Sequence, residues 1–168
     1  MATYVEPIVR AQAGNLSDQS VWRDLINGLP KGLPQAGDAG LDHTPTWGRT
    51  YWGGALFYLL ADVEIRKRTN NRRSLQVALA AIVAAGGNIT QEWTVDKVIA
   101  TADSGTGTNV IRDLYEKMKD TPYPVDLASL WRDLGVSMND GYIVLDDAAP
   151  LAHIRRAITT PPSATPPR

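Results

Sequence analysis

The sequence of 168 residues contains no cysteine and only two histidines, which excludes several kinds of chemistry. Without cysteine there is no disulfide, no thiolate metal ligand and no cysteine nucleophile, although the compartment is not fixed by this. A helical zinc site of the His-Glu-x-x-His type needs two histidines four residues apart. His43 and His153 lack this spacing. We interpret each as an ordinary loop or surface histidine.

Long apolar runs and a strong charge of one sign are also missing. No run reaches the roughly 18–20 apolar residues that span a bilayer, so no membrane span is expected. No basic region followed by an apolar stretch marks a signal peptide; the signal of an exported parent would lie upstream. The formal net charge of -1 does not favour nucleic acid as a partner. Hydrophobic residues make up 43% of the chain, which is enough for a core.

Apolar periodicity predicts a mainly α-helical fold, a multi-helix array over residues 1–159. The residues 160–168 are rich in proline, and we expect a disordered tail there. A short β-hairpin near 137–145 is the most β-structure expected, because Tyr142 to Leu145 is strand-like and follows the turn Asn139-Asp140-Gly141.

The N-terminal quarter shows helix signals followed by a long loop. Pro7 fits the first turn of a helix that Gly14 closes, and Ser17 fits the N-cap of a second helix. The stretch from Gly28 to Trp47 holds three prolines and four glycines. We expect a long ordered loop there, and such loops are usually functional or mobile.

The third helix has the clearest periodicity and ends in basic residues. A single apolar stripe is expected from Trp52, Leu56, Leu59, Leu60 and Val63. Later helices are expected after caps at Ser74 and Thr94, around Val110 to Met118, and from Leu127 to a C-cap at Gly135, with a last helix from Pro150. We interpret Gly105-Thr-Gly107-Thr as a turn before a cap at Thr108.

A basic cluster lies at the end of the third helix. Its members are Arg66, Lys67, Arg68, Arg72 and Arg73. These cations could bind an anion, or they could complement the dipole at a solvated helix end, by roughly 0.3–1 kcal/mol each. The second interpretation is the commoner one for such clusters.

The segment Thr50-Tyr51-Trp52-Gly53-Gly54-Ala55 is unusual because a glycine inside a helix costs about 1 kcal/mol relative to alanine. Either the helix only begins there, or another backbone or a substrate comes within contact distance. Tyr51 beside this opening could point its hydroxyl into a cleft. Spacing alone favours the packing explanation over a functional site.

Two stretches resemble gluzincin zinc aminopeptidases. The opening Ala2-Thr3-Tyr4-Val5-Glu6 is similar to the residues after the third zinc ligand, where Glu-Gly-Phe-Ala precedes a small residue, Tyr, an apolar residue and Glu. The metal-binding Glu of that pattern would stand just ahead of Met1. Tyr51-Trp52-Gly53-Gly54-Ala55-Leu56 resembles the Tyr-x-Lys-Gly-Ala motif that opens a later helix. The resemblance implies that the Tyr51 hydroxyl donates a hydrogen bond to the tetrahedral oxyanion during peptide hydrolysis.

Over most of the chain, the amino-acid sequence is more similar still to bacterial glycyl aminopeptidase-like proteins. The similar stretches are residues 4–8, 29–34, 43–54, 60–66 and 149–155. The sequence departs from the family in three ways. The His-Glu-x-x-His helix and the third ligand are absent, Gly53 replaces the lysine of the second motif, and a proline-rich tail stands where a PDZ domain often follows.

These residues predict part of a zinc-dependent aminopeptidase that hydrolyses N-terminal residues of peptides and is inactive in isolation. The resemblance implies no cofactor in this chain and zinc in the longer bacterial parent, whose compartment, periplasmic or other, stays open. Tyr51 is the predicted catalytic residue, and the expected substrate cleft includes Thr50, Trp52, Gly53 and Gly54. The implied partners are a peptide substrate, the zinc-bearing N-terminal half, and a second copy through exposed apolar surface. The alternative is a non-catalytic helical domain that binds a peptide or protein.

Overall fold

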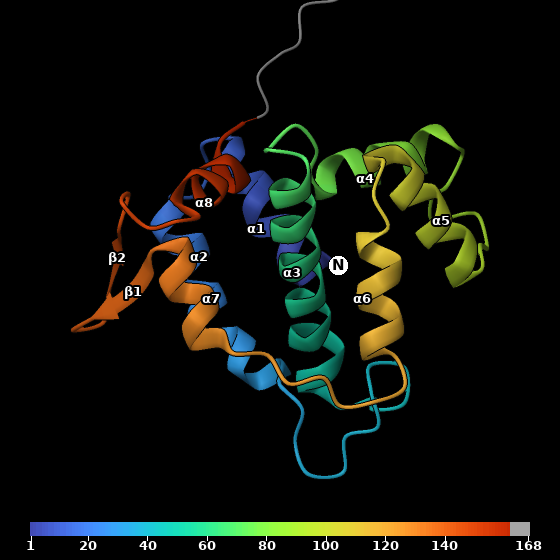
Figure 1. The fold of residues 1–168 in the computed structure, drawn as a ribbon, viewed down its shortest axis with the longest axis horizontal. Coiled ribbons are helices and arrows are strands. Elements are labelled where there is room, and N and C mark those ends of the chain that lie inside the picture. Colours follow the sequence, from blue (N-terminus) through green and yellow to red (C-terminus); the bar gives the residue numbers. More distant parts are fainter. Residues whose placement is uncertain (162–168) are drawn as a thin grey trace, which may run out of the picture.

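The computed structural model describes residues 1–161, which are mainly helical (Figure 1). The α-helices of this part are α1 (Ala2–Gln12), α2 (Asp18–Gly28), α3 (Gly54–Arg68), α4 (Leu75–Ala84), α5 (Val95–Thr106), α6 (Val110–Met118), α7 (Leu127–Leu134) and α8 (Ala152–Thr159). The other elements are the 3-10 turn η1 (Leu29–Gly32), the π-helical turn η2 (Gly48–Gly53) and the strands β1 (Val136–Asn139) and β2 (Tyr142–Leu145). The predicted mainly helical fold with a short hairpin is confirmed. Residues 162–168 of the predicted tail lie outside the described part.

Helix α3 runs through the middle of the molecule, with α1, α4, α6 and α8 packed around it (Figure 1). Its buried residues are Ala55, Leu56, Phe57, Leu59, Ala61, Asp62, Val63, Ile65 and Arg66. The residues of the predicted apolar stripe do pack into the core, but neighbours also bury α3 on other sides, and Trp52 belongs to η2. In residues 1–161, no helix has both the length and the apolarity needed to cross a bilayer.

Helix α1 begins five residues before the proline that was expected to open it. Pro7 lies inside the helix, where it lacks the N–H that would donate to the carbonyl of Thr3. Tyr4 and Ile8, four residues apart, are both buried on the inner side of α1. Burial of these two large side chains outweighs the helix-breaking effect of Pro7, which a local pattern does not reveal.

Several helix ends follow the predicted signals. The Ser17 hydroxyl accepts from the Ser20 N–H at 3.2 Å, and the Thr94 hydroxyl accepts from the Lys97 N–H at 3.2 Å. Gly135 ends α7 in the left-handed conformation, with φ at 68°. The expected turn at 105–108 is displaced, because α5 continues through Thr106 and ends at Gly107.

Gly105 stays helical because α4 packs closely against α5 at this point. A β-carbon at Gly105 would lie 2.4 Å from the β-carbon of Ala81, so only glycine fits without a shift of one helix. Close helix packing therefore explains a glycine that the sequence pattern presents as part of a turn.

The predicted strand 142–145 pairs antiparallel with β1, from Val136 opposite Leu145 to Asn139 opposite Tyr142. Asp140 and Gly141, both with positive φ, form the turn. Val136 and Ile143 are buried against the helices, whereas Tyr142 is 71% exposed. The hairpin is therefore attached to the helical core through one face only.

The carboxylate of Asp62 joins three elements in the core. Oδ2 accepts from the Tyr4 hydroxyl at 3.0 Å, and Oδ1 accepts from Arg66 Nε at 3.0 Å and from the Leu75 N–H at 2.9 Å. Arg66 in turn donates to the Asn71 side chain at 3.1 Å. Burial, reinforced by the Asp62 carboxylate, raises the pKa of Tyr4 well above its usual value. This buried network fixes α1 and the start of α4 on α3.

Asp62→Ala should lower the free energy of unfolding by about 3–5 kcal/mol, because it leaves a buried guanidinium, a phenol and an N–H without their acceptor. Urea unfolding followed by circular dichroism measures the change. Glu64→Ala on the same helix is the matched control. It removes only surface ion pairs with Lys67 and Arg68 and should cost about 1 kcal/mol or less. Equal losses in the two variants would contradict the role given to Asp62.

Candidate functional site

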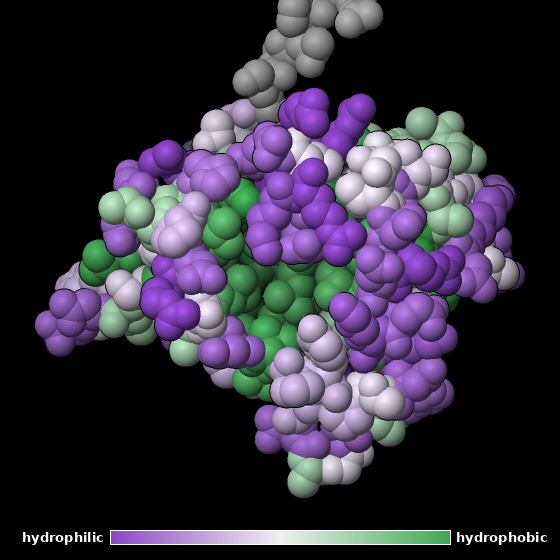
Figure 2. Space-filling model, in the orientation of Figure 1, coloured by the Kyte–Doolittle hydropathy of each residue, from purple (hydrophilic) through white to green (hydrophobic). Residues whose placement is uncertain are grey.

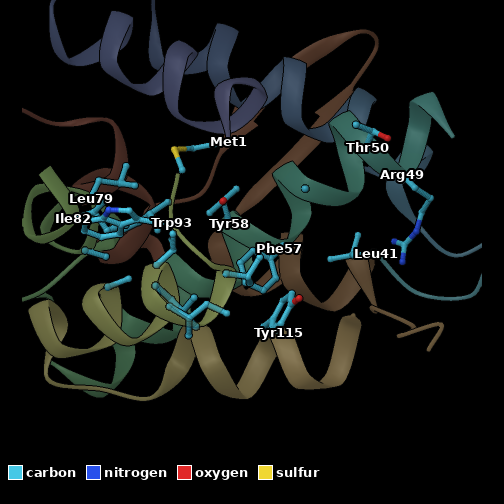
Figure 3. Close-up of a pocket in the computed structure, with 18 residues that line it drawn as sticks. Met1, Leu41, Arg49, Thr50, Phe57, Tyr58, Leu79, Ile82, Trp93 and Tyr115 are labelled. Atoms are coloured by element: carbon cyan, nitrogen blue, oxygen red, sulfur yellow. The ribbon is translucent and has the colours of Figure 1, made fainter. Parts of the chain in front are cut away.

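An apolar cavity of about 410 Å³ opens between the start of α1 and helices α3 to α6 (Figure 3). It is lined by Met1, Leu41, Arg49, Thr50, Gly54, Phe57, Tyr58, Leu75, Ala78, Leu79, Ile82, Trp93, Val95, Val98, Ile99, Ala102, Ile111 and Tyr115. Most of these groups are aliphatic or aromatic, and few polar atoms reach the surface of the cavity. Such a lining suits an apolar side chain with one or two polar anchors.

The cavity brings together the ends of two segments that are far apart in the sequence. Met1, at the start of α1, lies on one side, and Thr50, within η2, lies on another (Figure 3). Gly54, the first residue of α3, also lines the cavity. Partial burial lowers the pKa of the Met1 α-amino group. A chain continuing upstream from Met1 would therefore start at the wall of this cavity.

The predicted site residues are divided by the fold. Thr50 and Gly54 line the cavity, whereas Tyr51 does not. The Tyr51 side chain is on the surface, with 52% of the residue exposed, and its ring centroid lies 5.8 Å from that of Trp47. Tyr51 is thus an accessible phenol one residue from the cavity wall and is not sealed in the core.

Trp52 and Gly53, the other two predicted cleft residues, pack against η1 and the long loop instead of lining the cavity. The Trp52 ring covers Gly28, where a β-carbon would lie 2.0 Å from the ring. Gly53 is buried beside the Leu41 side chain, 3.0 Å from the position of an added β-carbon. These two residues hold the segment that carries Thr50 and Tyr51.

Turns η1 and η2 touch backbone to backbone, and glycines make this contact possible. A β-carbon at Gly32 would lie 2.3 Å from the carbonyl carbon of Trp52, and one at Gly48 would lie 2.4 Å from the carbonyl oxygen of Lys31. A π-helical turn is rare, and one at the entry to a helix often marks a functional position. Of the two glycines for which the sequence suggested a close approach, Gly53 has the Leu41 side chain 3.0 Å from its β-position, whereas Gly54 has no atom within 4 Å.

A buried ion pair ties the long loop to η2. Arg49 Nε lies 2.6 Å from Asp38 Oδ2, and the two side chains are 2% and 1% exposed. The Nε–H direction does not suit a hydrogen bond there, but Arg49 Nη2 donates to Asp38 Oδ1 at 3.3 Å. Arg49 Nη1 also donates to the Gly32 carbonyl at 2.6 Å. One guanidinium thus holds η1, the loop and the cavity wall together.

Tyr115 is a cavity residue that the sequence analysis missed. Its hydroxyl donates to Asp42 at 2.5 Å, and this bond, with some burial, raises the Tyr115 pKa to about 12. The loop is also fastened to the end of α6 by the Leu41 N–H, which donates to the Met118 carbonyl at 2.8 Å. Tyr115 follows Ile111, another cavity residue, by four residues, so the helical period of the helix predicted around Val110 to Met118 places the two side chains on one side.

His43 belongs to this loop attachment and faces Asp120 at 2.9 Å, with both side chains more than half exposed. Within residues 1–161, no three His, Cys, Asp or Glu side chains are grouped closely enough to hold a metal ion. The described residues therefore do not fit a resident zinc ion.

A second hollow, of about 390 Å³, lies between α3, α6 and α7 on the face shown in Figure 2. Its floor is apolar and its rim is charged (Figure 2). The apolar floor includes Leu60, Val63, Leu114, Leu130 and Leu151. None of the predicted site residues contributes to it.

Gly32→Ala should destabilise the protein by about 1–3 kcal/mol, because the new methyl group meets the η2 backbone, which cannot move aside cheaply. The control Gly54→Ala adds the same methyl group where no atom lies nearby. It should stabilise helix α3 by roughly 0.5–1 kcal/mol. Thermal unfolding of both variants measures the two shifts, and shifts of the same sign would contradict the glycine contact.

Comparisons with models of known protein families, with curated proteins and with solved structures found no match to this chain.

Proposed function

We propose that this chain is the substrate-cleft part of a zinc aminopeptidase catalytic unit, acting together with a zinc-bearing segment. The observation that carries the proposal is that Met1, Thr50 and Gly54 line one cavity. Met1 immediately precedes the first of the two stretches that resemble gluzincin aminopeptidases. Thr50 immediately precedes the second and Gly54 lies within it, although about fifty residues separate the two stretches in the sequence. A zinc ligand just upstream of Met1 would then lie beside the apolar cavity that receives a substrate side chain.

Tyr51 has the role of oxyanion donor in this proposal. Its phenol is accessible and next to a cavity residue, as a donor to a substrate carbonyl must be. Gly53 stands where the related motif has lysine, so that cation has no counterpart here. In this proposal the zinc and the general base come from the zinc-bearing segment; in residues 1–161 no three His, Cys, Asp or Glu side chains are grouped closely enough to hold a metal ion. No step through the metal is derived for this chain.

The proposed partners follow from the same arrangement. Peptides with a free amino terminus are the substrates, and the zinc-bearing segment covers the surface around Trp47 and Tyr51, two residues that are both more than half exposed. When that segment is absent, a second copy of the chain would meet the same apolar surface.

Tyr51→Phe, made in a longer protein in which a His-Glu-x-x-His segment precedes this chain, should lower kcat by about 10²–10³-fold, because one oxyanion donor is removed. KM should change little. Steady-state hydrolysis of aminoacyl-p-nitroanilides measures both constants.

The matched control is Tyr142→Phe, which removes the hydroxyl of an exposed tyrosine in the hairpin and should leave kcat unchanged. The chain of 168 residues alone should give no turnover with zinc present. Unchanged kcat in Tyr51→Phe would remove the catalytic role of Tyr51, and turnover by the chain alone would overturn the proposal of a shared site.

A second candidate function is binding of a peptide or protein without catalysis. It is favoured by the apolar lining of the cavity, which is large enough for one or two side chains. The two candidates differ in the need for Tyr51, because a binding domain uses the cavity and has no oxyanion to stabilise.

Val98→Asp should weaken binding of apolar peptides by about tenfold or more, because a carboxylate in the cavity wall is poorly solvated once a ligand covers it. Val83→Asp is the control, since Val83 is 68% exposed and lies outside the cavity. Fluorescence anisotropy with labelled peptides of different N-terminal residues measures the affinities. Equal affinities in the two variants would show that the cavity is not the binding site.

A further inference from the structure

A basic hollow lies between the turn that connects α3 to α4 and the turn that connects α5 to α6. It is an open space of about 790 Å³, lined by Arg68, Thr69, Arg72, Arg73, Thr106, Gly107 and Thr108. None of these residues lines the apolar cavity, and no carboxylate contributes to the lining. We call this space the arginine hollow.

Two turns face each other across the arginine hollow. One connects α3 to α4 and the other connects α5 to α6, and both lie at the same end of the molecule, at the top of Figure 1. The side chains that line it therefore come from segments that are more than thirty residues apart. The tertiary structure, and not a local run of basic residues alone, brings the arginines and threonines together.

The turn between α3 and α4, residues 69–74, is held in one shape by its own hydrogen bonds. The Thr69 hydroxyl donates to the Ile65 carbonyl at 2.7 Å and accepts from the Arg73 N–H at 3.1 Å. Arg72 Nε donates to the Thr69 carbonyl at 3.1 Å, and its two terminal nitrogens have no hydrogen-bond partner within residues 1–161. A positioned guanidinium loses less side-chain entropy on binding than a free one.

The charges of this hollow are only partly neutralised. Arg68 is paired with Glu64 at 2.9 Å and with Asp113 at 3.5 Å. Arg72 and Arg73 form no ion pair with any carboxylate in residues 1–161, and both are exposed. The positive charge that no carboxylate neutralises therefore lies on Arg72 and Arg73, which come after the end of α3.

The other wall supplies polar groups and a left-handed glycine. Gly107 ends α5 with φ at 68°, and the hydroxyls of Thr106 and Thr108 lie 2.9 Å apart. The nearby Asp103 carboxylate is buried and bound to the N–H groups of Ile111 and Arg112, both at 3.0 Å. It is therefore occupied in capping α6 and does not reach across to the arginines.

We propose that the arginine hollow binds a phosphate group, held by the terminal nitrogens of Arg72 and Arg73 and bordered by the Thr108 hydroxyl. The planar fork of arginine matches the oxygens of a phosphate, and such charge-assisted hydrogen bonds are stronger than neutral ones. The phosphate dianion also supplies the negative countercharge that these two arginines lack. This proposal does not depend on the aminopeptidase assignment, because the hollow shares no residue with the cavity.

The test follows inorganic phosphate binding to the full chain by two-dimensional NMR, at constant ionic strength maintained with chloride. The expected shifts are confined to the amides of 68–73 and 106–108 and to the arginine Nε–H groups. Arg72→Gln with Arg73→Gln should weaken phosphate binding by about tenfold or more. Arg72→Lys with Arg73→Lys keeps the charge but not the planar fork of arginine. Its affinity for phosphate should lie between those of the unchanged protein and the glutamine variant.

The control Arg10→Gln with Arg23→Gln removes the same charge from exposed positions on α1 and α2, and it should change the affinity by about twofold at most. Vesicles of phosphatidylcholine with or without phosphatidic acid form a second arm, which tells a lipid phosphate from a free one. If binding of inorganic phosphate or of phosphatidic acid vesicles is lost in the glutamine variant and kept in the control, the result supports the arginine hollow as the binding site. Shifts spread over the surface, equal weakening in the control, or no binding in either arm would overturn the proposal.

Discussion

The Asp62 carboxylate is the constraint on which the arrangement of the other elements depends. A carboxylate with this little access to water is stable only if its oxygens accept several strong hydrogen bonds. It accepts three, from Tyr4 on α1, Arg66 on α3 and the first N–H of α4 at Leu75. The requirement that all three donors converge fixes the crossing of α1 over α3 and the place where α4 begins. Apolar packing alone would leave these helices free to slide, because hydrophobic contacts have little directional preference.

The candidate site depends on a second close contact, between η1 and η2. Arg49 brings its charge into the protein only because Asp38 and the Gly32 carbonyl receive it. The glycines at 32 and 48 then allow the two turns to approach at distances that a β-carbon would prevent. In this contact η2 has the uncommon π-helical form, in which Thr50 lines the cavity while Tyr51 is exposed to solvent. The orientation of the predicted catalytic phenol is thus set by packing beneath it.

The sequence was sufficient for the helical class, the hairpin and most helix caps, because these depend on neighbours within one turn. Ser17, Thr94 and Gly135 are identified by the chemistry of their own side chain or backbone. The errors occurred where a distant partner decided the outcome. Pro7 lies within α1 because Tyr4 reaches Asp62, and Gly105 is helical because Ala81 approaches it. The site was predicted less well than the fold for the same reason, since Tyr115 and Asp42 meet only after the long loop folds back on α6.

The two proposed sites trace back to the same buried network. Tyr4 sets the position of α1 and hence of Met1 at the apolar cavity, whereas Arg66 and Asn71 shape the turn that carries Arg72 and Arg73. Asn70 and Asn71 both have positive φ, so the chain reverses tightly at this point. The next two residues, Arg72 and Arg73, then line the same hollow as Thr106 and Thr108. Arg66 was grouped with the surface cations by sequence, yet it is 5% exposed and belongs to the core. One run of basic residues is therefore divided by the fold between a structural role and an exposed face available to an anion.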